Sequence, residues 1–390
     1  MAAGKIRPAT RVRWASTTGT AVALSAAMSV AMTFALSSMG LSSVCHAQTP
    51  TKAPTATAPG AAASSPVQHL RVVGGLAGLS QFTRHEEPFW TRDLPSLSGG
   101  RVQAEIVPFD RAGIRGQDML RLMGLGVVPF GTALLALSTT EVPIAAAADL
   151  AGLNPDIATL RRSVAAFRPH LESTLRERHG IELLALYTYP AQVLFCNKPF
   201  PDLSGLVGRR VRVSSAAQAD LINALGARAV TTGFAEIMPN LRSGNLDCAV
   251  TGAMSGHTIG LHEVTTHLHG MAMGWGLAAF GANAGAWQAL GPEVQALLRS
   301  ALPKLEQGIW AESEREAVEG LACNSGAAAC RNGKRGAMTL VSSTVDDERR
   351  RKQIFADTVL PRWVQRCGAG CAEIWNRTLG PVTGVVAKGL

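Results

Sequence analysis

The chain has 390 residues, of which 47% are hydrophobic and 17% charged, a globular composition that is long enough for two domains and excludes an intrinsically disordered chain. The formal net charge of +9 would by itself suit nucleic-acid binding. Four of these charges lie at Lys5, Arg7, Arg11 and Arg13, and without them the net charge falls to +5, so no concentrated basic arm predicts a nucleic-acid partner.

The first 47 residues have the three parts of a secretory signal peptide. A basic start, KIRPATRVR, precedes the apolar stretch AVALSAAMSVAMTFALSSMG, and small residues then lead to VCHAQ. Cleavage after Ala47 would place Cys45 and Ala47 at the small-residue positions of the cleavage site. Val44 before Cys45 does not suit a lipoprotein signal. We expect a cleaved signal peptide over residues 1–47 and a periplasmic protein. An uncleaved membrane anchor is the alternative, because the apolar stretch is nearly long enough to span a bilayer.

Residues 48–68 are expected to form a flexible linker. This segment is rich in Pro, Thr and Ala and has almost no large apolar side chain that a core could bury. The folded part should begin near His69. No later segment has an uninterrupted apolar run long enough to span a bilayer.

The pattern of apolar residues predicts alternating strands and helices from Leu70 onward. In the first half we expect strands over residues 70–76, 102–109, 126–132, 181–190 and 191–197, and helices between Phe82 and Gly99, around Met119–Met123, and over 160–175 up to Gly180. In the second half we expect strands over 211–213, 227–233 and 246–252, helices from Ser214 or Ser215 and over 234–244, a long strand over 266–283 that returns across the molecule, and a long helical tract over 291–322.

This alternation is typical of an α/β protein with mostly parallel sheets. The elements are too many for one sheet, and no change of composition separates two domains in series. We therefore expect two α/β lobes between which the chain crosses more than once on hinge strands. Lobe I is predicted over residues 69–190 and 277–315, and lobe II over 191–276 and 316–390 with a cysteine-containing C-terminal tail.

Six cysteines remain if Cys45 is removed with the signal peptide. An even number in an exported protein suggests disulfides. Of the fifteen possible connectivities, we prefer Cys323–Cys330, Cys367–Cys371 and Cys196–Cys248. Free buried thiols at positions 196 and 248 are the alternative.

The chain lacks the common catalytic motifs. VVGGLAG has Val73 where a dinucleotide fingerprint needs glycine, and GAMSG has its serine one place late for a nucleophile elbow. No phosphate-binding G-x-x-x-x-G-K-[ST] loop and no H-E-x-x-H occur. We therefore expect neither catalysis nor a cofactor.

The stretch HLHGMAM gives an alternative function from another class. On a strand, His267, His269, Met271 and Met273 would share one face. Imidazole and thioether ligands together suit copper. A periplasmic copper-binding protein is thus the second hypothesis, although such side chains also pack in cores.

Arg212 is the residue with the clearest functional placement. It lies on the short strand Val211–Val213, with its side chain opposite to those of the two valines. The helix that follows begins near Ser214 or Ser215, which are good N-caps, and the free N–H groups of a helix start favour an anion. Open α/β sheets bind ligands at this end of a strand, and a guanidinium binds a carboxylate bidentately. Arg210 on the same strand face is the competing candidate.

The segment DLSGLVGRRVRVSSAAQADLINALGARAVTTGFAEIMPNLRSGNLDCAVTG resembles the core of the TRAP-type (tripartite ATP-independent periplasmic) solute-binding proteins of the DctP family. The family pattern is matched at preserved spacing by Val211-Arg212-Val213, Ala224-Leu225-Gly226-Ala227, Phe234, Glu236 and Asp247. The resemblance extends more weakly from Leu70 to about Gly320.

The resemblance implies a two-lobed clamp, as in periplasmic binding proteins, that closes on an organic anion such as a carboxylate or dicarboxylate. It would deliver this ligand to the membrane permease subunits of a TRAP transporter. The family's signature arginine falls on Arg212, and the aromatic residue that packs on the ligand falls on Phe234. Many members have a second arginine where this chain has Gln192, and a family amide is replaced by Thr251. Gln81 and Thr132, at the ends of strands, are further candidates for hydrogen bonds to the ligand.

Overall fold

The computed structural model describes residues 67–138, 140–331 and 333–389. The predicted signal peptide and residues 48–66 of the predicted linker lie outside the described residues. The first strand begins at Gln68, next to the predicted start of the folded part at His69.

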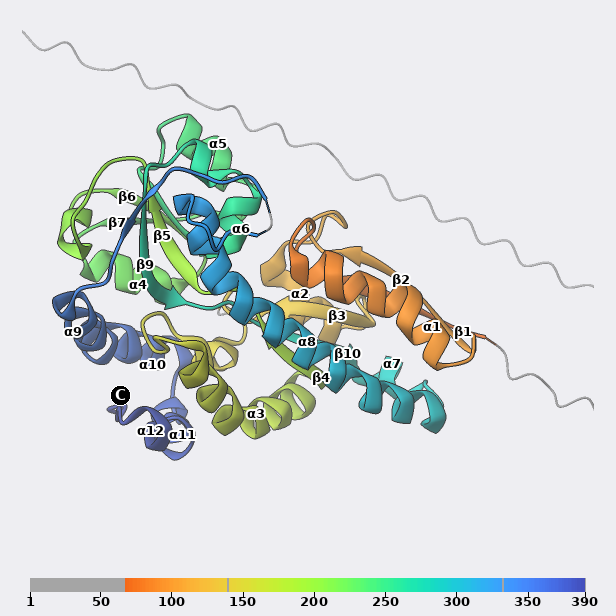
Figure 1. Cartoon of the computed structure of the whole chain (residues 1–390). Coiled ribbons are helices and arrows are strands. Elements are labelled where there is room, and N and C mark those ends of the chain that lie inside the picture. Colours follow the sequence, from red (N-terminus) through yellow and green to blue (C-terminus); the bar gives the residue numbers. More distant parts are fainter. Residues whose placement is uncertain (1–66, 139, 332, 390) are drawn as a thin grey trace, which may run out of the picture. The chain divides into compact units, whose positions relative to one another are not determined.

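The first sheet has the strand order β2-β1-β3-β10-β4 (Figure 1). Its strands are β1 (Gln68–Gly74), β2 (Val102–Pro108), β3 (Phe130–Leu134), β4 (Ile181–Thr188) and β10 (Leu277–Asn283). β1 is parallel to β2 and β3, and β10 is antiparallel to β3 and β4. The edge strand β2 alternates between buried and more exposed residues, whereas the central strand β3 is buried almost throughout. The other edge strand, β4, is also buried almost throughout, because the helices α3 (Ile157–His179) and α8 (Pro292–Ser325) pack on it.

The second sheet has the strand order β11-β9-β5-β8-β6-β7. Its strands are β5 (Gln192–Cys196), β6 (Arg210–Val213), β7 (Arg228–Thr231), β8 (Cys248–Gly252), β9 (His267–Gly274) and β11 (Thr339–Val341). β6 is parallel to β7 and β8, and β9 is parallel to β11. β5 is antiparallel to β8 and β9.

The α-helices are α1 (Leu94–Leu97), α2 (Met119–Gly124), α3 (Ile157–His179), α4 (Ala216–Ala224), α5 (Ile237–Arg242), α6 (Ala253–Thr258), α7 (Ala284–Gln288), α8 (Pro292–Ser325), α9 (Val345–Ile354), α10 (Leu360–Cys367), α11 (Cys371–Thr378) and α12 (Gly380–Thr383). Shorter π-helical and 3₁₀ turns are η1 (Gln81–Glu86), η2 (Phe89–Asp93), η3 (Gly116–Asp118), η4 (Pro143–Asp149), η5 (Leu203–Leu206), η6 (Leu261–Glu263) and η7 (Phe355–Val359). As predicted, α3 ends at Gly180, which has a φ of 62°, a conformation that glycine adopts readily.

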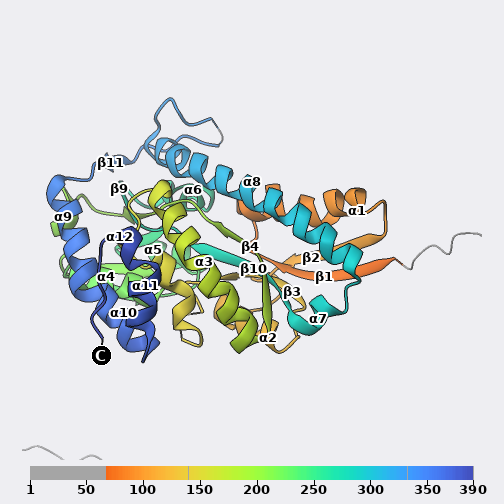
Figure 2. The same ribbon diagram turned by 90° about the horizontal axis from the view of Figure 1, so that it is seen from below.

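The longest helix, α8, contacts both sheets. It is continuous over 34 residues and packs on β4 of the first sheet and on α6, β9 and β11 around the second. Figures 1 and 2 show it running past both sheets. The predicted lobe boundary between residues 315 and 316 falls inside this helix, and the residue boundaries of the lobes stay a prediction.

The chain crosses between the sheets at two adjacent short segments, residues 189–191 and residues 275–276, and a third time through α8, which leads to β11. The predicted single strand over 266–283 was wrong, because β9 and β10 belong to different sheets. Gly276 between them has a φ of 105°, which favours glycine. The buried carboxylate of Asp149 accepts the backbone N–H groups of Trp275 (3.1 Å), Gly276 (2.7 Å) and Leu277 (3.2 Å), so the break in the strand is held by hydrogen bonds.

The two-sheet α/β architecture with parallel strands and crossing hinge strands confirms the predicted fold class. The preferred disulfides are confirmed as well: Cys196–Cys248, Cys323–Cys330 and Cys367–Cys371. Cys196 and Cys248 face each other in the register of β5 and β8, so the alternative of free thiols is wrong. Within the described residues, no helix combines the length and the apolar character that crossing a membrane requires.

Candidate functional site

Arg212 lies on β6 of the second sheet, between the edge strand β7 and β8. Val211 and Val213 are fully buried in the core, and the alternation of a strand turns Arg212 to the opposite face. Directly after β6, the side chain of Ser215 accepts the N–H of Gln218 and caps α4. The predicted arrangement of strand, serine cap and helix start is therefore present.

The guanidinium of Arg212 is buried, and no anionic side chain among the described residues pairs with it. The residue is only 4% exposed. Its Nε and Nη2 donate to the carbonyl of Thr232 (3.2 and 3.0 Å), and Nη1 donates to the carbonyl of Val250 (2.8 Å). No carboxylate of the described residues forms an ion pair with it, and further N–H donors stay unused. Burial lowers the pKa of Arg212 from its usual value to about 10, so the group is still charged at neutral pH.

Arg210, the competing candidate, is used by the protein itself. Its Nη2 lies 2.9 Å from Oδ1 of Asp247, and its Nε lies 3.0 Å from Oδ2 of the same side chain. This bidentate pair neutralises Arg210. Of the two arginines on β6, only Arg212 has a charge that no carboxylate in the described part of the chain neutralises.

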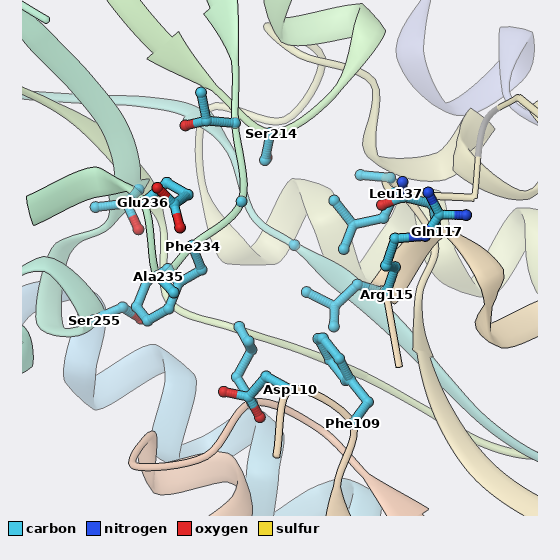
Figure 3. A pocket seen from close by; sticks show the side chains of 18 of the residues that line it. Phe109, Asp110, Arg115, Gln117, Leu137, Ser214, Phe234, Ala235, Glu236 and Ser255 are labelled. Carbon is cyan, nitrogen blue, oxygen red and sulfur yellow. The ribbon is translucent and has the colours of Figure 1, made fainter. Parts of the chain in front are cut away.

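Arg212 lines a cavity of about 700 Å³. The cavity walls come from both sheets and the loops that follow their strands. Around it Figure 3 shows residues from two parts of the chain. From the part that carries β2 and β3 of the first sheet come Phe109, Asp110, Arg115, Gln117 and Leu137, and from the part that carries β6, β7 and β8 of the second sheet come Ser214, Phe234, Ala235, Glu236 and Ser255. A small molecule held there would contact both parts at once.

The structure brings four of the six predicted site residues to this cavity: Gln192, Arg212, Phe234 and Thr251. Thr251 is 4% exposed, and its hydroxyl forms no hydrogen bond within the described residues. Gln192 is held at both ends of its amide, because its Oε1 accepts from Nε2 of Gln218 and its Nε2 donates to the carbonyl of Trp275 (3.3 Å). These side chains form a polar floor at the ends of β5, β6 and β8.

Gln81 and Thr132 do not line the cavity, which corrects their prediction as ligand contacts. Both side chains are fully buried and form hydrogen bonds to other side chains of the protein. Nε2 of Gln81 donates to Oε2 of Glu316 (3.1 Å). The hydroxyl of Thr132 donates to Oε1 of Glu86 (2.6 Å). Carboxylates from distant segments of the sequence, Glu316 and Glu86, thus accept the hydrogen bonds that we expected Gln81 and Thr132 to donate to a ligand.

Several cavity residues escaped the sequence prediction. Tyr189, Phe109, Ser214 and Ser255 line the cavity. Tyr189 and Phe109 directly follow the ends of β4 and β2, the positions where open sheets bind ligands. An aromatic residue just after a strand was the available signal for both.

The charges around the cavity leave room for one negative charge. Arg115 is paired with Asp118, with Nε 2.8 Å from Oδ2. Asp110 and Glu236 are exposed at the cavity, one from each part of the chain, and neither forms an ion pair within the described residues. Arg212 is therefore the unpaired cation among the cavity's described residues, and the two acids disfavour a second anionic group on the ligand.

The predicted copper set on β9 has partners within the protein instead. Nδ1 of His269 accepts the N–H of Met271 (3.2 Å), and its Nε2 lies 3.5 Å from Oδ2 of Asp347. The His269 ring stacks on Phe200, and Met271 and Met273 are buried in the core. In the described residues no group of three His, Cys, Asp or Glu side chains is arranged to hold a metal ion. The copper hypothesis therefore has no support.

Comparison with known families gives one match. The family model described as bacterial extracellular solute-binding protein, family 7 (DctP), matches residues 85–326. The comparison with curated proteins found no match.

The fold is similar to that of solved solute receptors. DctP7 of Bordetella pertussis, an extracytoplasmic solute receptor binding pyroglutamic acid, is 18% identical with a TM-score of 0.70, over 80% of this chain and 99% of that chain. A TRAP periplasmic solute-binding protein from Desulfovibrio salexigens with bound orotic acid is 17% identical with a TM-score of 0.70, over 82% and 99%. One from Desulfovibrio desulfuricans with bound sn-glycerol-3-phosphate is 14% identical with a TM-score of 0.68, over 80% and 96%. At sequence identities this low, the structural similarity establishes a shared fold and nothing more.

Proposed function

We propose that this chain, which belongs to the DctP family of TRAP-type solute-binding proteins, captures an organic monocarboxylate in the periplasm and delivers it to the membrane permease of its transporter. Export rests on the predicted signal peptide with cleavage after Ala47. The chain performs no chemistry in this proposal, and its working step is the closure of the two lobes over the ligand.

A single observation carries the proposal: the buried, charged guanidinium of Arg212 lines the cavity and lacks a carboxylate partner in the described part of the protein. An isolated buried charge is expensive. Two carbonyl oxygens offset part of this cost, and the remaining N–H donors are free to bind a carboxylate in a charge-assisted pair. Burying that pair gives both affinity and selection for an anion.

The proposed ligand has one negative charge and a partly apolar body. The amide of Gln192 adds no positive charge at the floor, and Asp110 and Glu236 add negative charge. Phe109 and Phe234 supply apolar surface from the two parts of the chain. The similar receptors described with pyroglutamic acid and orotic acid hold compounds with one carboxyl group. The receptor described with sn-glycerol-3-phosphate makes a phosphate the competing anion.

The test compares two arginine variants in ligand binding. Calorimetric titration of wild type, Arg212→Ala and Arg210→Ala would cover a panel of monocarboxylates, dicarboxylates and sn-glycerol-3-phosphate. Losing one partner of a buried charge pair costs about 2–5 kcal/mol, so Arg212→Ala should weaken binding by at least about 30-fold. Arg210→Ala removes the same charge from the same strand and should keep the affinity, since Arg210 is paired with Asp247.

Three outcomes would contradict the proposal. One is an Arg212→Ala variant that keeps full affinity. Another is tighter binding of dicarboxylates than of monocarboxylates with the same carbon skeleton. The third is that the compound of the panel that binds is sn-glycerol-3-phosphate, which carries a phosphate and no carboxylate.

A further inference from the structure

Tyr189 lies at the edge of the cavity, where the chain leaves the first sheet. It follows β4 directly, and its N–H donates to the carbonyl of Gly276 (3.2 Å) in the adjacent crossing. The residue is 4% exposed and lines the cavity. Its side chain is thus held in a fixed place next to the proposed ligand.

The hydroxyl of Tyr189 has a proton that forms no hydrogen bond to any of the residues the structure describes. Its oxygen accepts the N–H of Leu76 (3.3 Å), and in the described residues no acceptor takes its proton. Burial raises the pKa of Tyr189, and the charge of Glu86 raises it further, so the proton stays on at neutral pH. In contrast, the hydroxyl of nearby Tyr187 donates to Glu86. A buried donor without an acceptor costs free energy, and a ligand in the cavity can supply the missing acceptor.

The surroundings of Tyr189 favour an uncharged acceptor. A Cβ atom placed on Gly75 would lie 2.4 Å from the hydroxyl oxygen of Tyr189 and 3.2 Å from Oε2 of Glu86, so both oxygens flank the same backbone position. Glu86 already accepts hydrogen bonds from Gly75 N–H, Thr132 and Tyr187. A second carboxylate of the ligand at this place would be repelled by the negative charge of Glu86. An uncharged carbonyl oxygen would be repelled much less.

The neighbouring amide is also a donor toward the cavity. A Cβ atom on Gly276 would lie 2.9 Å from Nε2 of Gln192 and 3.4 Å from Cβ of Tyr189, so these two side chains flank the same glycine. Oε1 of Gln192 is occupied by Gln218, whereas Nε2 uses one N–H on Trp275 and has a second to offer. The free N–H of the Gln192 amide therefore also favours a ligand oxygen that accepts a hydrogen bond.

We propose that Tyr189 is a specificity-determining residue, whose hydroxyl donates a hydrogen bond to an uncharged carbonyl oxygen on the same monocarboxylate that Arg212 binds. The ligand class is then the oxo- and amido-monocarboxylates. This inference rests on the proposed function, because it needs the carboxylate at Arg212 to place the carbonyl at Tyr189.

The test uses pairs of acids that differ only in the carbonyl group. Levulinate is compared with pentanoate, and 3-oxocyclopentanecarboxylate with cyclopentanecarboxylate, by calorimetric titration of wild type, Tyr189→Phe, Tyr187→Phe and Arg212→Ala. Wild type should bind the carbonyl-containing member of a pair about tenfold more tightly, the size of one neutral hydrogen bond. Tyr189→Phe should abolish this preference. Tyr187→Phe, which removes a hydroxyl outside the cavity lining, should keep the preference.

The possible failures are distinguishable. If Arg212→Ala weakens all four acids but Tyr189→Phe keeps the preference, the role of Tyr189 is wrong and the proposed function stands. If Arg212→Ala changes nothing, the proposed function itself fails. The wild-type comparison needs no variant: equal affinity within both pairs, or no binding of any of the four acids, overturns the inference even if Tyr189→Phe does not fold.

Discussion

Replacing Arg212 with methionine should stabilise the ligand-free protein while it removes binding. The lowering of the Arg212 pKa to about 10 on burial corresponds to a penalty of about 3 kcal/mol for holding the charged form inside the protein. Methionine fills a similar volume without a charge. It leaves the carbonyls of Thr232 and Val250 without their N–H donors, which costs about 1 kcal/mol each. The expected net effect is a gain of about 1 kcal/mol in the free energy of unfolding.

The expected gain in the free energy of unfolding of Arg212→Met depends on the pH of the measurement. A basic group whose pKa is lowered on folding carries its full penalty below the folded pKa, and the penalty is relieved as the pH rises from there toward the unfolded pKa. Both values for Arg212 lie well above neutral pH. At pH 7 the wild type therefore bears the whole penalty, and Arg212→Met is relieved of it.

Urea denaturation of ligand-free protein at pH 7 measures this difference. Arg210→Met is the matched control: it breaks the partly exposed pair with Asp247 and should leave stability equal or slightly lower, because such pairs contribute little. A loss of about 2 kcal/mol or more in Arg212→Met would refute the reasoning. It would mean that the guanidinium serves to tie the backbone at Thr232 and Val250 together rather than to hold a ligand.

Two further predictions concern the scaffold that positions the site. Asp149→Ala removes the acceptor of three backbone N–H groups at the crossing between β9 and β10, and should destabilise the protein by about 3 kcal/mol or more in urea denaturation; an unchanged midpoint would show that the crossing holds without it. Cys196→Ser with Cys248→Ser opens a link across a sequence separation of 52 and should cost about 4 kcal/mol. Cys367→Ser with Cys371→Ser, where the separation is 4, should cost less, and equal losses in the two double variants would contradict this explanation.

Local sequence was sufficient to place Arg212. The apolar residues on either side of it and the serine cap that follows are all within a few positions, and they fix the strand, the face on which Arg212 lies and the helix start together. Phe234 was placed by family resemblance, and the structure brings it to the same cavity. The disulfides followed from the spacing of the cysteines and from the assumption of export.

Contacts between distant segments explain what the sequence could not show. The hydroxyl oxygen of Tyr189 is held by the N–H of Leu76, 113 positions away, so its unused proton is visible only in the folded structure. The side-chain amide of Gln81 donates to Glu316, 235 positions away. The break at Gly276 depends on Asp149, 127 positions away. Polarity at the end of a strand could be recognised from the sequence, but which polar groups were already satisfied could not.

The most direct measurement is mass spectrometry of the small molecules that purified protein releases when it is denatured. The account predicts a compound with one carboxyl group, present at a stoichiometric level in wild type and Arg210→Ala and lost from Arg212→Ala. A released compound without an acidic group, or the same amount of compound from Arg212→Ala as from wild type, would contradict the claim that Arg212 is held in the cavity to bind a carboxylate.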